Sequence, residues 1–218
     1  MSKTSSIGKK LIMSISGLFL ILFLLFHMSM NMVAIFSDEG YNAICEFLGA
    51  NWYALVGTGI LALGFIIHII YAFILTIQNR KARGVERYAA QDRPATVEWA
   101  SQNMLVLGLI VLLGIALHLS QFWAKMQLPE IMGQEPANGA ALINETFKNP
   151  VNVVIYLVWL AAIWFHLSHG FWSAFQTIGW NNKIWIERWR RISVVVVTII
   201  FCGFASVVIA AFIKNVIA

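Results

Sequence analysis

Five long apolar stretches, separated by short polar segments, constrain this chain more than any other feature of its sequence. Each has the roughly 20 mostly apolar residues that a helix needs to cross a bilayer. The whole chain is 60% hydrophobic and only 11% charged, which leaves too little polar surface for a water-soluble domain. The stretches are residues 11–36, 52–77, 100–123, 151–177 and 192–213.

The composition of these stretches predicts helices. A backbone in lipid must satisfy its own hydrogen bonds, so a spanning segment is either a helix or part of a closed barrel. The stretches lack the polar and apolar alternation of barrel strands. We expect an all-α, polytopic membrane protein with five transmembrane helices in a single domain, residues 1–218. The connection 124–150 contains three prolines and is expected to be mostly irregular, with a short interfacial helix as an option.

Lys and Arg residues alternate between the connections and predict the orientation of the spans. Residues 1–10 contain three, connection 78–99 contains five and connection 178–191 contains four. Connection 37–51 contains none, connection 124–150 contains two, and the C-terminal tail contains one. Cytoplasmic segments carry the excess of these residues, so we expect the N-terminus in the cytoplasm and the C-terminus outside. A site for lipid headgroups or for a partner is the alternative explanation of the clusters.

Charge and cysteine placement exclude several other classes of protein. The net charge of +5 is held in short clusters between apolar runs, which argues against nucleic-acid binding. Cys45 and Cys202 form no CxxC or CxxCH pattern, so no zinc ribbon, iron–sulfur cluster or covalently attached haem is encoded. Any redox cofactor must be held by other residues.

All five histidines lie within the apolar stretches, and each of the first four stretches contains at least one. A strongly polar side chain in a span needs a partner that offsets its desolvation, which makes it a functional candidate. For any single histidine the alternative is a hydrogen bond to a neighbouring helix, worth about 0.6 kcal/mol on average. The five are His27, His68, His118, His166 and His169.

Depth along the spans sorts these histidines into two levels. At 1.5 Å per residue, His27 and His118 lie roughly 24–27 Å from the cytoplasmic ends of their spans, in the outer half. His68 lies about 14 Å from the cytoplasmic end of its span, and His166 and His169 lie about 12–17 Å from theirs, in the inner half. Each level therefore receives histidines from two different helices.

Two facing imidazoles at one level suit the two axial positions of a haem iron. The pattern predicts two bis-histidine haems in a haem-binding four-helix bundle, with the fifth helix beside it. A zinc site or a proton relay is the alternative, but nearly all carboxylates lie in loops or at span ends, so none is placed to complete a tetrahedral site. Depth does not choose between His166 and His169.

The segments around the histidines resemble the diheme cytochrome b membrane anchors of succinate:quinone oxidoreductases, in their single-subunit, five-helix form. Succinate dehydrogenases and fumarate reductases contain such anchors, and the resemblance covers essentially the full length of the chain. It is carried by SGLFLILFLLFHMSMN in the first span, GFIIHIIYAF in the second, GIALHLSQFW in the third and FHLSHGFWSAFQTIGW in the fourth.

The resemblance implies the metal ligands. His27 and His118 are implied as the axial ligands of the outer haem, and His68 with a fourth-span histidine as those of the inner haem. The family pattern H-x-S-x-G, followed by an apolar and an aromatic residue, selects His166 for the fourth span. It aligns with His166, Ser168, Gly170, Phe171 and Trp172.

Three further residues are candidates for contact with the cofactors. The resemblance assigns no role to His169. It is either a second polar group beside the haem or in the quinone pocket, or simply a packed polar residue. Ser16 lies eleven residues before His27, three turns along the same helix face and therefore near the inner level; with Ser14 it could hydrogen-bond a haem propionate. Serines that bond backbone carbonyls within the helix are the alternative.

The resemblance also implies a function in electron transfer. A cytoplasmic flavoprotein, joined to an iron–sulfur subunit that docks on the inner loops, would oxidise succinate in the tricarboxylic acid cycle or reduce fumarate. Electrons would pass through two b haems to or from a membrane quinone, with menaquinone implied by the presence of two haems. The chain is then an electron-transfer subunit without a dicarboxylate site, in the cytoplasmic (inner) membrane of a bacterium.

Two other functions compete with this interpretation. The first is the cytochrome b subunit of another membrane complex, such as a hydrogenase or a formate dehydrogenase. Those subunits commonly place two ligands on one helix, whereas here four helices give one each. The second is a transporter that uses intramembrane histidines. A haem b absorption spectrum of the purified chain separates the two redox functions from the transporter.

Overall fold

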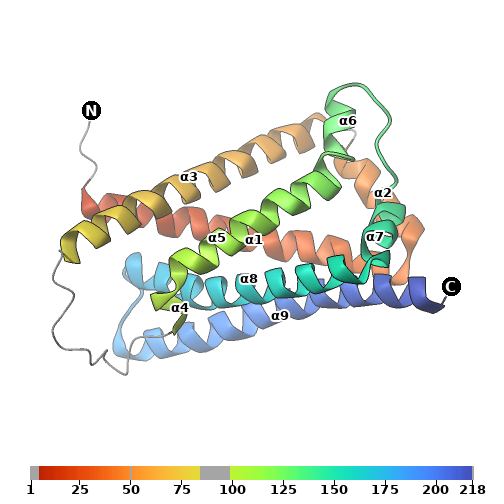
Figure 1. Ribbon diagram of the computed structural model, residues 1–218. Coiled ribbons are helices and arrows are strands. Elements are labelled where there is room, and N and C mark those ends of the chain that lie inside the picture. The colour runs from red at the N-terminus through yellow and green to blue at the C-terminus, as the bar shows by residue number, and fades with distance from the viewer. Residues whose placement is uncertain (1–4, 50, 84–98, 218) are drawn as a thin grey trace.

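The computed structural model describes residues 5–49, 51–83 and 99–217, and all regular structure in these ranges is helical. Five segments are long and apolar enough to cross a membrane, and Figure 1 shows them running side by side. This confirms the predicted all-α, five-span architecture. The segments are α1 (Ser6–Phe36), α3 (Trp52–Arg83), α5 (Met104–His118) continued by η1 (Leu119–Trp123), α8 (Pro150–Thr177) and α9 (Lys183–Ile217).

The third span departs from the expected uninterrupted helix over 100–123. A four-residue helix, α4 (Trp99–Gln102), precedes α5 and is separated from it by Asn103. Directly after His118 the chain widens into the π-helix η1, in which the Ala124 amide donates to the carbonyl of Leu119 at 2.8 Å. Short π-helical segments are rare and occur frequently at functional sites.

Three shorter helices fill the connections at one end of the bundle, where α9 also finishes (Figure 1). They are α2 (Asp38–Gly49), α6 (Gln127–Ile131) and α7 (Gly139–Lys148). The expectation that 124–150 is mostly irregular is therefore wrong. The reason is amphipathicity: α7 places Ile143 and Phe147, four residues apart, in the buried core.

The fifth span also begins earlier than expected, because Asn182 caps the amides of Ile184 and Trp185.

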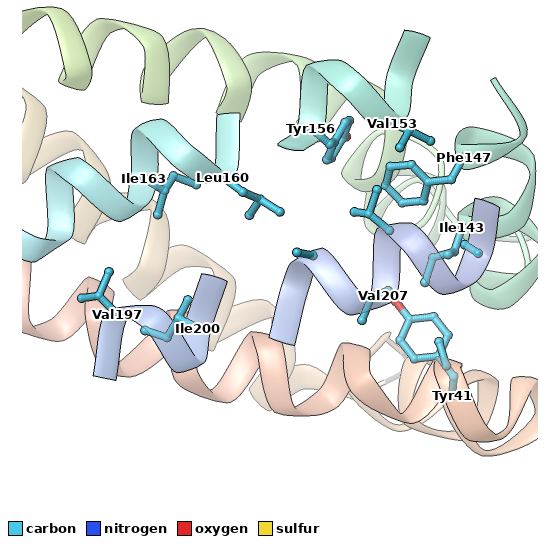
Figure 2. Packing of buried hydrophobic residues seen from close by; sticks show 14 of the residues in the cluster. Tyr41, Ile143, Phe147, Val153, Tyr156, Leu160, Ile163, Val197, Ile200 and Val207 are labelled. Carbon is cyan, nitrogen blue, oxygen red and sulfur yellow. The ribbon is translucent and has the colours of Figure 1, made fainter. Parts of the chain in front are cut away.

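The buried core lies where α8 and α9 pack against each other and against α1. Figure 2 shows Leu160 and Ile163 of α8 in the same cluster as Val197 and Ile200 of α9, whose side chains are each 1% exposed. The Ser193 hydroxyl of α9 donates to the Ser168 carbonyl of α8 at 2.7 Å. These two helices therefore form the most closely packed part of the fold.

The outer face of α3 is apolar and exposed. Ile60, Leu63, Ile66 and Ile70 are each about half exposed and follow one another at three- and four-residue spacing. In a bilayer such a stripe faces acyl chains, so its exposure is expected. α3 packs mainly on α1, and α5 packs mainly on α8. The two helices are therefore attached to the bundle through different neighbours.

We expect Ile200→Ala to lower the free energy of unfolding by about 2 kcal/mol, chiefly through the cavity left in the α8–α9 core. The transfer contribution that adds to this loss in water is weak in lipid. Unfolding of the purified chain in mixed detergent micelles measures the change. The matched control is Ile199→Ala, because Ile199 is 53% exposed on the same helix. Equal losses for the two variants would contradict the assigned core.

Candidate functional site

Four of the five histidines meet in two pairs, each of which joins two helices. His27 of α1 lies beside His118 at the end of α5, with ring centroids 5.9 Å apart and ring planes at 81°. His68 of α3 lies beside His166 of α8, with centroids 6.5 Å apart and planes at 70°. We call these the outer pair and the inner pair, after the levels at which the sequence puts them.

The two pairs lie at different positions along the bundle. On α1, the inner pair is contacted by Ser16, eleven residues before His27. On α5, Gly108 lies against the ring of His166, ten residues before His118. At 1.5 Å per residue, both helices separate the pairs by about 15 Å along their axes. The rings therefore form two separate sites within one bundle.

One large cavity connects the pairs. Its volume is about 1230 Å³, and its walls come from α1, α3, α5 and α8 among other elements. All four paired histidines line it, as does Ser14. The walls are predominantly apolar, which suits a large, flat, hydrophobic group better than a hydrated ion.

The cavity becomes polar toward the helices α2 and α6. Its lining there includes Asn42, Glu46, Gln127 and Glu130. The amide nitrogen of Gln127 is buried with no hydrogen-bond partner among the described residues. Partial burial raises the pKa of Glu130 above its ordinary value. This end therefore offers hydrogen-bonding groups to a ligand that has an apolar body and a polar head.

Aromatic side chains enclose the outer pair. Phe122, Tyr156 and Trp159 lie with ring centroids 5.0, 6.3 and 5.8 Å from that of His118. Their own polar groups are bonded: the Tyr156 hydroxyl donates to Gln121 Oε1 at 2.7 Å. Trp159 Nε1 donates to the carbonyl of Val111 at 3.1 Å. Tyr156 was not predicted from the sequence as a site residue. The signal was present, because a tyrosine hydroxyl inside a span needs a hydrogen-bond partner.

The His27 side of the outer pair has a polar neighbour in Asn31, one turn further along α1. The Asn31 side-chain amide donates to the His27 carbonyl at 2.8 Å, and its nitrogen lies 3.4 Å from His27 Nδ1. Asn31 Oδ1 accepts from the hydroxyl of Tyr41 at 3.3 Å. Burial raises the pKa of Tyr41, so its hydroxyl keeps the proton that it donates. Asn31 was likewise not predicted from the sequence as a site residue.

The glycines Gly17 and Gly108 let backbone approach the inner pair. A Cβ atom at Gly17 would lie 3.3 Å from His68 Cε1, and one at Gly108 would lie 3.5 Å from His166 Cε1. A larger side chain at Gly17 would push the His68 ring aside. The α1 backbone is therefore part of the wall that holds this ring.

Two ring nitrogens of the paired histidines are left without partners. Nδ1 of His118 and Nδ1 of His166 are buried and have no hydrogen-bond partner in the described part of the chain. A buried polar atom without a partner costs about 1–3 kcal/mol, so such atoms call for an explanation. A metal bound at Nε2 would keep the proton on Nδ1, so in these two rings the N–H would still need an acceptor.

The remaining sequence candidates are placed as follows. Ser16 is buried, and its hydroxyl lies 3.2 Å from His68 Nδ1 and donates to the Met13 carbonyl at 3.0 Å. Ser14 is buried and lines the cavity. The ring of His169 lies 5.0 Å from that of Trp172, and His169 is missing from the described residues that line the cavity. The inner pair thus contains His166 and not His169.

The pair geometry is compatible with a metal ion between two imidazoles. Metal–nitrogen bonds of about 2.0 Å on opposite sides of an ion put the two ring centroids about 6 Å apart. The two observed separations, 5.9 and 6.5 Å, lie on either side of this value. In the described part of the chain, no three His, Cys, Asp or Glu side chains gather into a group that could hold a metal ion. The histidines meet in twos, the number of axial positions on a haem iron.

The chain matches no family model, no curated protein and no solved structure. Its functional assignment therefore depends on the histidine pairs, on the cavity between them and on the resemblance of the span motifs. The structure establishes a helical protein with five segments that could span a membrane.

Proposed function

We propose that this protein is the cytochrome b membrane anchor of a succinate:quinone oxidoreductase. It would bind two b haems and carry electrons between an iron–sulfur subunit and a membrane quinone. The observation that carries the proposal is the presence of two crossed histidine pairs on four helices. Their centroid separations of 5.9 and 6.5 Å suit a shared iron, and both pairs line one apolar cavity.

The residues of the chain would hold and tune the cofactors. His27 and His118 would ligate one haem iron, and His68 and His166 the other. When bound, each haem supplies reversible one-electron chemistry. The ring of Phe23, stacked on His27 at 5.3 Å, and that of Trp159 would exclude water from the outer site. Burial of this kind sets the potential of a metal centre.

The polar end of the cavity supports a quinone as the membrane substrate. A quinone has an apolar body and two carbonyl oxygens, and the side-chain amide of Gln127, which has no partner in the described ranges, would donate to one of them. The carboxyl of Glu130 lines the same end, and partial burial raises its pKa. Menaquinone is proposed from the resemblance, since two haems distinguish the anchors that use it.

The arrangement of ligands favours this function over its competitors. In the anchors of hydrogenases and formate dehydrogenases two ligands commonly share a helix, whereas each pair here takes one histidine from each of two helices. A proton-coupled transporter would need titratable partners for its histidines. Ring neighbours of the outer pair are instead aromatic.

We expect the purified chain to contain two b haems, and single substitutions of the paired histidines to remove one each. His27→Ala and His118→Ala would lose the outer haem, and His68→Ala and His166→Ala the inner one, because a single imidazole holds a buried haem weakly. The pyridine-haemochrome content per chain measures this. His169→Ala is the matched control and keeps two haems. Two haems in His166→Ala together with one in His169→Ala would reverse the fourth-span assignment.

The orientation of the spans can be tested by cysteine labelling. In a background with Cys45→Ser and Cys202→Ser, we expect Glu135→Cys to react with a membrane-impermeant maleimide in intact bacterial cells. Asn181→Cys should react only after the cells are opened, because the Lys- and Arg-rich connections face the cytoplasm. Labelling of Asn181→Cys in intact cells would invert the topology and exchange the inner and outer levels.

The partners decide the reaction. Affinity purification of the tagged chain from its native membrane should recover a flavoprotein and an iron–sulfur subunit, and the complex should reduce a quinone analogue with succinate or oxidise a quinol analogue with fumarate. Recovery of hydrogenase or formate dehydrogenase subunits would assign the chain to another complex while leaving its haem ligands in place.

A further inference from the structure

The four paired histidines differ in what their second ring nitrogen contacts. Nδ1 of His68 faces the hydroxyl of Ser16 at 3.2 Å, whereas Nδ1 of His166 and Nδ1 of His118 are buried without partners among the described residues. Nδ1 of His27 faces the side-chain nitrogen of Asn31, which donates to a backbone carbonyl and has no lone pair to accept a proton. Within the described ranges, an acceptor for a ring N–H is thus found at His68 and at none of the other three Nδ1 atoms.

The hydrogen bonds of Ser16 determine which group donates. A serine hydroxyl has one proton and two lone pairs. Ser16 uses the proton within its own helix, where it donates to the Met13 carbonyl at 3.0 Å. The contact with His68 is then one in which the ring N–H donates and the serine oxygen accepts. Because the Ser16 hydroxyl proton is donated to the Met13 carbonyl, it is not placed to bond a haem propionate. This differs from the role that the sequence suggested for Ser16.

This direction matters for metal binding. A neutral imidazole carries one N–H, and the nitrogen without a hydrogen is the one that can bind a metal. A proton held on Nδ1 leaves the lone pair of Nε2 free. A hydrogen bond from the second nitrogen of a metal-bound histidine to an acceptor also fixes the ring orientation and makes the ligand more basic. A more basic ligand favours the oxidised iron, which lowers the reduction potential.

We propose that Ser16 is a positioning residue for the inner haem: its hydroxyl accepts the Nδ1 proton of His68, fixes the tautomer in which Nε2 binds iron, and lowers the reduction potential of that haem alone. The inference depends on the proposed function, because it assumes a haem at the inner pair. Ser16 is 8% exposed, so water has little access to replace its hydroxyl as an acceptor. The Met13 carbonyl also bonds the His68 ring, which agrees with a proton on Nδ1, and it is the acceptor that stays in Ser16→Ala.

The test is a redox titration of both haems in the full-length chain, purified with its complex, for Ser16→Ala and Ser16→Thr. Ser29→Ala is the matched control, because the Ser29 hydroxyl makes the same kind of bond within α1, to the Leu25 carbonyl at 2.8 Å, but faces no histidine in the described contacts. The low-spin ferric EPR signals are recorded in parallel. The inner haem is identified as the one that disappears in His68→Ala.

We expect Ser16→Ala to favour reduction of the inner haem about tenfold. This change in the equilibrium constant raises the midpoint potential by about 59 mV for one electron. Its EPR signal should shift, while the outer haem keeps its potential and signal. Ser16→Thr, which retains a hydroxyl, should restore both, and Ser29→Ala should match the parent. Loss of the inner haem in Ser16→Ala with recovery in Ser16→Thr supports the same role in a stronger form.

Three outcomes overturn the inference. They are two retained haems with unchanged potentials in Ser16→Ala, a change confined to the outer haem, and equal loss of the inner haem in the Ala and Thr variants. The first leaves the proposed function intact, since both haems are still bound. Absence of haem b from the parent chain and complex would instead overturn the proposed function itself.

Discussion

A ring nitrogen inside a lipid bilayer has no water to bond, so it must find its partner within the protein. This constraint organises the centre of the molecule. Four histidines come from four different helices and face one another in pairs, and the polar groups around them are bonded to backbone carbonyls or to one another. Among the buried nitrogens without a partner in the described ranges are two that belong to these pairs, Nδ1 of His118 and Nδ1 of His166. The polar interior of the bundle is therefore concentrated where the proposed cofactors would bind.

The bundle has a closely packed part and an open part. α8 and α9 form a close interface in which Val197, Ile200 and Ser193 are almost fully buried. α3 and α5 flank the bundle from its other side, and the cavity lies between them and the packed helices. Tight packing in one half fixes the backbone positions of α1 and α8, so the rings that they carry are held at the wall of the cavity.

α1 links the two levels because it contributes to both. It carries His27 at the outer pair and presents Ser16 and the bare backbone of Gly17 to His68 at the inner pair. It also packs against α3, α8 and α9. A single straight helix thus sets the spacing between the pairs and the surroundings of two of the four rings. If each pair holds a haem as proposed, the different partners of the rings at the two levels would let the two ligand sets be tuned separately.

Length, hydrophobicity and the helical rise of 1.5 Å per residue are properties of each span by itself, and for that reason the sequence determined the five spans and the separation of the four paired histidines into two levels. Rotation of a helix about its axis depends on its neighbours. Depth alone could not separate His166 from His169, and the packing of α8 turned His166 toward His68 of α3. His169 instead lies beside Trp172, three residues further along α8.

The same reason explains the other differences. Helix α7 exists because its apolar face meets the core, which the prolines of that connection do not reveal. The Tyr156–Gln121 bond and the contact of Ser16 with His68 each join residues far apart in the chain. The sequence determined what each helix carries and how deep it lies. Tertiary structure alone decided which side chains face one another, because that depends on the packing of helices that the chain's local pattern does not specify.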